Sequence, residues 1–104
     1  MKIEILYVTD CPHYDPAVEL VEQILREEGV CAEIQSKQIC DLAAALAAKF
    51  PGSPTIRING RDVEAGTGSD VAAVGCRLYP GTGGVPSLDT IRSAVRAEKQ
   101  REGL

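Results

Sequence analysis

Four cysteines and a single histidine are the residues of this sequence with the most distinctive chemistry. The cysteines are Cys11, Cys31, Cys40 and Cys76, and the histidine is His13. A thiolate is a nucleophile towards disulfides and a ligand for soft metals. No two cysteines have the CxxC spacing and only one histidine is present, so the pattern gives little support to a zinc site, and we expect no metal centre.

Cys11 lies where an apolar segment gives way to a helical pattern, within residues 9–14 (Thr-Asp-Cys-Pro-His-Tyr). A thiol at a helix N-terminus faces unpaired N–H groups and the positive end of the helix dipole, which favours the thiolate. A protonated His13 would strengthen this effect, and Asp10 would oppose it. The alternatives are that Cys11 is a small buried residue at a strand end, and that His13 is an ordinary polar loop residue.

Two elements are predicted before and after this segment. Residues 1–8 alternate with apolar side chains on both faces, which is typical of an interior strand. Residues 16–28 have the apolar spacing of a helix. Pro16 is tolerated only in the first turn, so the helix should begin near residues 14–16, with Asp15 as N-cap and Gly29 as its C-terminal stop.

A second strand and a second helix are predicted next. Residues 30–39 alternate between apolar and polar side chains, as a strand does. Asp41 is the expected cap of the following helix. This helix is predicted over residues 41–50, where alanine is frequent and larger apolar residues recur at helical spacing, namely Leu42, Leu46 and Phe50.

The second half of the chain contains the clearest turn signal. Asn59-Gly60 lies between the alternating residues 55–58 and 61–65, which predicts a hairpin with a type I′ turn. Residues 66–86 include six glycines and have no firm periodicity, which indicates a long functional or mobile loop. Without a lysine or a recognised glycine motif, this loop is not expected to bind phosphate.

A last helix is predicted from Ser87, which caps it, with Leu88, Ile91 and Val95 facing inward. The order is therefore strand, helix, strand, helix, hairpin, helix. The first strand–helix–strand unit should be parallel with a right-handed crossover, and the hairpin adds two antiparallel strands. We expect an α/β fold with a mixed four-stranded sheet and helices on both faces, in one domain over residues 1–104.

Composition limits the classes of function. The chain has 104 residues, of which 44% are hydrophobic and 25% charged, as in ordinary globular domains. Its net charge of −4 argues against nucleic acid and anionic membrane surfaces as partners. No apolar run approaches a membrane span, and the first residues do not resemble a signal peptide. We therefore expect a cytoplasmic protein, in which structural disulfides are rare.

The element order and two motifs resemble the thioredoxin superfamily over essentially the whole chain. Residues 9–14 look like the CxxC site of that family with the second cysteine replaced by Tyr14. Residues 52–55 (Gly-Ser-Pro-Thr) resemble its cis-proline loop, which implies a cis bond between Ser53 and Pro54.

A third motif narrows the resemblance. Residues 75–79 (Gly-Cys-Arg-Leu-Tyr), followed by residues 85–87 (Val-Pro-Ser), are similar to those of a small thioredoxin-like group. Members of this group are often labelled alkylmercury lyase or thioredoxin family protein.

The resemblance implies a thiol–disulfide oxidoreductase without a cofactor, acting on protein disulfides or glutathione-type thiols. Cys11 would be the attacking thiolate. Cys76 is the candidate second thiol, because in this topology the loop after Ala65 emerges on the Cys11 side of the sheet, and glutaredoxins hold glutathione with the corresponding loop. That loop is expected to fold over the Cys11 end of the sheet, with Leu78 and Tyr79 as apolar anchors. The residues that would contact the substrate are Pro12, His13, Tyr14, Ser53, Pro54 and Thr55.

The other thiols and functions stay open. Cys76 could instead be a packing residue, Cys40 could face the same edge as Cys11, and Cys31 is expected at the opposite edge with a structural role. Thiolates close together would select mercury or copper(I). Cleavage of organomercurials would need two thiolates and an acid, for which Cys11, Cys76 and Asp10 are the candidates. A third possibility is a non-catalytic module that binds a partner through the groove.

Overall fold

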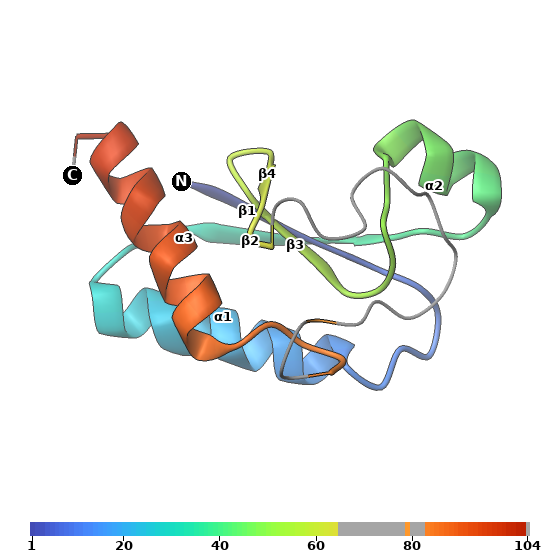
Figure 1. Cartoon of the computed structure of the whole chain (residues 1–104), viewed down its shortest axis with the longest axis horizontal. Coiled ribbons are helices and arrows are strands. Elements are labelled where there is room, and N and C mark those ends of the chain that lie inside the picture. Colours follow the sequence, from blue (N-terminus) through green and yellow to red (C-terminus); the bar gives the residue numbers. More distant parts are fainter. Residues whose placement is uncertain (65–78, 80–82, 104) are drawn as a thin grey trace.

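Four strands and three helices make up the part of the chain that the structure, a computed structural model, describes: residues 1–64, 79 and 83–103 (Figure 1). In chain order the elements are β1 (Lys2–Tyr7), α1 (Tyr14–Glu28), β2 (Glu33–Gln38), α2 (Leu42–Ala48), β3 (Thr55–Ile58), β4 (Arg61–Asp62) and α3 (Leu88–Arg101). The strands form one sheet in the order β2-β1-β3-β4. β1 pairs in parallel with β2 and antiparallel with β3, so the predicted mixed four-stranded sheet is confirmed.

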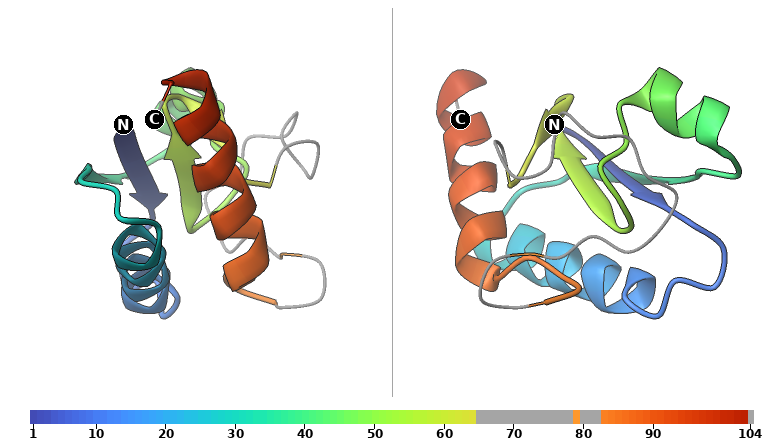
Figure 2. Two further views of the ribbon diagram at one scale, coloured as in Figure 1. Left: turned by 90° about the vertical axis from the view of Figure 1, so that its left-hand side faces the viewer. Right: turned by 45° about the vertical axis from the view of Figure 1, so that its right-hand side comes forward.

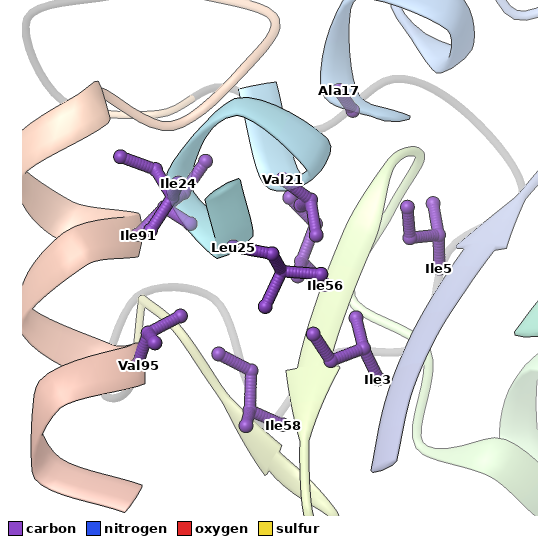
Figure 3. Close-up of a cluster of buried hydrophobic side chains, with 10 residues drawn as sticks. All are labelled: Ile3, Ile5, Ala17, Val21, Ile24, Leu25, Ile56, Ile58, Ile91 and Val95. Atoms are coloured by element: carbon purple, nitrogen blue, oxygen red, sulfur yellow. The ribbon is translucent and has the colours of Figure 1, made fainter. Parts of the chain in front are cut away.

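The side chains of β1 explain why helices cover both faces of the sheet. Ile3 and Ile5 point to one face and Leu6 to the other, and all three are buried. On the first face, Ile3 and Ile5 pack with buried residues of β3, α1 and α3, and together these side chains form the main core (Figure 3). On the second face, Leu6 packs with Ile39 and with Ala45 and Phe50 of the α2 region. β1 is therefore an interior strand, as its two apolar faces predicted.

The helix ends follow local rules with one exception. Gly29 ends α1 with a left-handed φ of 65°, and Asp41 and Ser87 cap α2 and α3 by accepting hydrogen bonds from backbone N–H groups. The prediction that Asp15 caps α1 is wrong. His13 occupies the N-cap position without a side-chain capping bond, and Asp15 lies inside the first turn, where its charge still favours the helix dipole.

The remaining boundaries differ in length from the predicted ranges. β2 begins at Glu33 rather than at residue 30, and its side chains are mostly exposed. β4 has only two residues, although Asn59 and Gly60 have the positive φ angles, 51° and 83°, that a type I′ turn requires. In α2, Leu42 and Leu46 are 57% and 60% exposed, so alanines and Phe50 rather than these leucines hold the helix against the sheet.

A buried carboxylate joins α3 to the hairpin. Glu98 is 3% exposed and accepts hydrogen bonds from Arg61, Arg101 and Asn59. Burial raises the pKa of the Glu98 carboxyl, but the three donors together lower it by more than burial raises it. The pKa of Glu98 therefore lies below its ordinary value. No sequence pattern predicted this contact, which connects segments 37 residues apart.

Candidate functional site

Cys11 lies in the short connection between the carboxyl end of β1 and the start of α1. The connection turns at Asp10, whose φ is 58°, and the carbonyl of Cys11 accepts a 3.3 Å hydrogen bond from the N–H of Tyr14. The side chain of Cys11 is partly exposed. Because His13 is the N-cap, Cys11 lies two residues before the cap and three before the first residue of α1, rather than at the helix N-terminus where the sequence predicted it. A reagent from solvent can therefore reach this thiol at the strand–helix junction.

His13 packs against the segment that leads into α3. A Cβ atom added to Gly84 would overlap the His13 ring, so only glycine lets the chain pass this close. The imidazole is partly buried by this contact. His13 therefore lies between the Cys11 connection and the segment that leads into α3, a contact that neither interpretation of His13 from the sequence included.

Tyr14, which stands where the CxxC pattern has its second cysteine, connects three elements. Its ring lies against Tyr7 of β1, with the ring centroids 4.2 Å apart and the planes inclined by 36°. Its hydroxyl is 2.5 Å from the hydroxyl oxygen of Ser36 in β2. These contacts hold the first residue of α1 against the sheet, so Tyr14 has a positioning role here.

The loop before β3 reaches the end of β1. The Ser53–Pro54 peptide bond is cis, as predicted. The Ser53 hydroxyl oxygen accepts a 3.1 Å hydrogen bond from the N–H of Val8, which is three residues before Cys11. The Thr55 hydroxyl donates to the carbonyl of Gly52 over 2.6 Å. Cys11 and the loop at residues 52–55 thus lie at the same end of the sheet, where β1 ends.

Tyr79 contacts Pro54. The Tyr79 side chain is 3% exposed, and its hydroxyl donates a hydrogen bond to the carbonyl of Pro54. Burial of Tyr79 agrees with its expected anchoring role, while Cys76, Leu78 and the rest of the loop that was expected to fold over the Cys11 end lie outside the described residues. Ser53, Pro54 and Thr55 are themselves buried, so of the six predicted substrate contacts it is Pro12, His13 and Tyr14 that have exposed surface.

The other described cysteines occupy different positions. Cys40 lies two residues after the end of β2, at the end of the sheet where β1 also ends, as predicted. The Ile39 N–H donates to the carbonyl of Tyr7, and the Gln38 side chain donates to Thr9. From there, however, the chain enters α2 on one face of the sheet, whereas Cys11 leads into α1 on the other (Figure 1).

Cys31 precedes β2 at the opposite end of the sheet, as predicted. Its side chain is exposed, so it is not a core packing residue. All three described cysteines are free thiols.

Neither a metal cluster nor a membrane-spanning helix is found in the described part of the chain. No group of three or more His, Cys, Asp or Glu side chains converges within residues 1–64, 79 and 83–103. None of the described helices is both long and apolar enough to cross a membrane.

Comparison with protein-family models gives no match, and comparison with curated proteins gives no significant similarity.

Sequence reasoning missed the contacts that fix the site. The pairs Val8–Ser53, His13–Gly84 and Pro54–Tyr79 join segments distant in sequence, and no local pattern specifies such partners. The one available signal was the consecutive glycines at residues 83 and 84, since a glycine outside a regular turn often marks a close approach of another chain segment.

Proposed function

We propose that this chain is a thioredoxin-like thiol protein in which Cys11 exchanges with a disulfide of a protein or of a glutathione-type thiol. The observation that carries the proposal is the place of Cys11: a partly exposed thiol between β1 and α1, three residues after Val8, which bonds Ser53 of the cis-proline loop. The sheet order β2-β1-β3-β4, with one parallel and two antiparallel pairings, is consistent with the thioredoxin topology. Free thiols of this kind suit a reducing compartment such as the cytoplasm.

The proposed reaction begins with the Cys11 thiolate, formed by loss of the thiol proton to water. The thiolate attacks one sulfur of the substrate disulfide, a bond forms between Cys11 and that sulfur, and the substrate S–S bond breaks. The other substrate sulfur leaves as a thiolate and takes a proton from water. The substrate disulfide is thereby reduced by one thiol, and Cys11 is held in a mixed disulfide.

Tyr14 cannot complete the reaction, because it has no thiol and its hydroxyl is engaged with Ser36. A second thiol must attack the mixed disulfide, releasing the substrate sulfur as a thiolate. The resemblance makes Cys76 the candidate within the chain, and glutathione is the candidate outside it. With Cys76 the product is a Cys11–Cys76 disulfide, which an external thiol then reduces. With glutathione it is a Cys11–glutathione mixed disulfide, which a further glutathione resolves.

His13 and Pro12 would form the surface that a substrate meets beside the thiol. The His13 ring packs against the chain at Gly84, and this contact limits how far the ring can move relative to Cys11. A protonated imidazole in this place would attract the thiolate and the carboxylates of glutathione. The buried residues Ser53 and Thr55 would act by fixing the loop rather than by touching the substrate.

Reaction of the reduced protein with oxidised glutathione tests the proposal. Each cysteine is followed by peptide mass spectrometry in the wild type and in the Cys11→Ser and Cys31→Ser variants. Cys31 is the matched control because it is also an exposed free thiol, at the opposite end of β2. We expect Cys11 to form the mixed disulfide about tenfold faster than Cys31, as an activated thiolate does. Equal rates at the two positions would overturn the proposal.

Mercury titration separates exchange from the alternative of soft-metal binding. A thiol count after addition of one equivalent of Hg²⁺ shows how many thiols each ion protects. Loss of two thiols per ion, together with no glutathione adduct at Cys11, would replace the exchange function with metal binding. Absence of both reactions at Cys11 would leave a binding module without thiol chemistry. Repeating the glutathione experiment with Cys76→Ser determines whether this residue resolves the mixed disulfide.

A further inference from the structure

The outer edge of β2 has the properties of a pairing surface. β2 is a terminal strand of the sheet, and the left view of Figure 2 shows it on the far side of β1 from β3 and α3. Among the described residues, no strand pairs with this outer edge. A six-residue edge strand of this kind presents unpaired N–H and C=O groups to whatever strand can align with them.

The hydrogen bonds to β1 identify which backbone groups are free. Ile39 donates its N–H to Tyr7 of β1, over 2.7 Å. Backbone groups alternate between the two edges of a strand, so the odd-numbered residues of β2 point their N–H and C=O groups towards β1. The even-numbered residues Ile34, Ser36 and Gln38 therefore point theirs outward.

The side chains divide in the same alternating way. Ile34 packs on the main core and Ser36 contacts Tyr14, so these residues lie on the face that α1 covers. Glu33, Gln35 and Lys37 lie on the opposite face, and all three are exposed. This strand thus has a negative charge near its start, a positive charge near its end and a neutral residue midway between them.

We propose that β2 pairs with β2 of a second copy of this chain, antiparallel and centred on Gln35. In this register Glu33 lies opposite Lys37 of the other copy, twice across the two-fold axis, and Gln35 lies opposite itself. Ile34 and Ser36 face one another as a hydrogen-bonded pair, which uses the outward backbone groups. The Glu33–Lys37 positions are then non-hydrogen-bonded pairs, where opposing side chains are closest.

Neighbouring registers satisfy the strand less well. If one copy moved along the other so that each residue faced the next residue along, outward backbone groups would lie opposite inward ones. The hydrogen bonds between the strands could then not form. A shift by two residues, centred on Ser36, would place Lys37 opposite Gln35 and leave Glu33 without the lysine. The charge pattern of β2 therefore selects the register centred on Gln35.

A groove that is lined by apolar, polar and charged side chains lies beside β2 and adds surface to the same contact. It has a volume of about 640 Å³ and lies between α1 and the chain leading into β2, with Val18, Leu25, Val30 and Ile34 among its lining residues. Leu25 is a buried residue of the main core, whereas Val18, Val30 and Ile34 are only partly buried against it. Antiparallel pairing places the grooves of both copies on the same face of one continuous eight-stranded sheet. Since a stable interface buries about 800 Å² on each partner, this surface would have to contribute along with the strand.

A charge-swap experiment tests both the dimer and its register. Sedimentation velocity measures the fraction of dimer at protein concentrations of about 10–500 μM, the range of weak dimers. The proteins compared are the wild type, Lys37→Glu, Glu33→Lys and the double variant carrying both changes. Each single change turns two attractive pairs into two repulsive ones and should weaken dimerisation about tenfold or more. The double variant restores opposite charges and should dimerise nearly as the wild type does.

Lys49→Glu is the matched control, because it makes the same charge change at an exposed residue whose carbonyl contacts β3 rather than β2. It should dimerise as the wild type does. If the wild type stays monomeric at about 500 μM, where even a weak dimer would be populated, the proposal is overturned. A dimer that the double variant fails to restore would overturn the register.

Disulfide cross-linking provides a measurement that does not depend on charge. In the variant Gln35→Cys the two introduced thiols face one another across the axis, so mild oxidation should link them between chains. In Lys37→Cys each introduced thiol faces Glu33 of the other copy, so this cross-link should be at least about tenfold slower to form, because disulfides require a short Cα separation. Equal cross-linking of both variants would contradict pairing centred on Gln35.

Discussion

Ser53→Ala tests whether a single buried hydroxyl joins the loop before β3 to the end of β1. The Ser53 side chain is fully buried, and its oxygen accepts the hydrogen bond of the Val8 N–H at 3.1 Å. Alanine removes the acceptor, and the space left by one oxygen atom is too small for a water molecule. The Val8 N–H is then left without this acceptor in a partly buried place.

The structure sets the size of the effect. An unsatisfied buried donor costs about 1–3 kcal/mol, and since Val8 is only partly buried we expect about 1–2 kcal/mol for Ser53→Ala. For a domain of this length, each kcal/mol lowers the melting temperature by roughly 4–8 °C. The free energy of unfolding is measured by urea titration followed by far-ultraviolet circular dichroism, with a reductant present to keep the thiols free.

Ser36→Ala is the matched control, because it removes a serine hydroxyl that also makes a hydrogen bond but at an exposed site. Water can replace that contact, so its cost should stay within about 0.5 kcal/mol. The slope of the urea transition should be the same in both variants and the wild type. Equal stability losses in the two variants would refute the reasoning, since burial of the hydrogen bond would then make no difference.

Three further changes have defined outcomes. Glu98→Gln should reduce the melting temperature at pH 7, and the difference from the wild type should shrink as the pH falls below about 4.5, because the lowered pKa of Glu98 stabilises the fold only while the group is ionised. Phe50→Ala should cost about 3–5 kcal/mol in urea titrations, against about 0.5 kcal/mol or less for the 60% exposed Leu46→Ala. Gly60→Ala should cost about 1–2 kcal/mol through backbone strain alone, since its φ is 83° and no atom lies within 4 Å of an added Cβ; an unchanged unfolding midpoint would contradict this.

The parts of the fold that the sequence predicted correctly are those with a local cause. The strand at β1, the caps Asp41 and Ser87 and the Asn59-Gly60 turn are each determined by a few neighbouring residues. The helix at α2 was also predicted, but the leucines that indicated it are exposed. Alanine side chains let this short helix approach the sheet closely, and periodicity alone does not tell which apolar face the sheet will bury.

The candidate site was predictable in part for the same reason. Cys11 could be placed between β1 and α1 because both elements have strong local patterns. The contacts around Cys11 could not be predicted, because Ser53 bonds Val8 and Tyr79 bonds Pro54 across long stretches of sequence. Tyr14 was expected to contact substrate, and only the structure shows its ring against Tyr7 and its hydroxyl beside Ser36.

The contacts of Tyr14 bear directly on the proposed chemistry. A cysteine at this position would lie near Cys11 and could resolve a mixed disulfide, but its short side chain could not reach both the ring of Tyr7 and the hydroxyl of Ser36. The chain therefore has a structural anchor where a resolving thiol would otherwise be available. If Cys11 attacks a disulfide as proposed, the mixed disulfide persists until a thiol from outside the residues 9–14 arrives, and its lifetime depends on the concentration or the approach of that thiol rather than on the first attack.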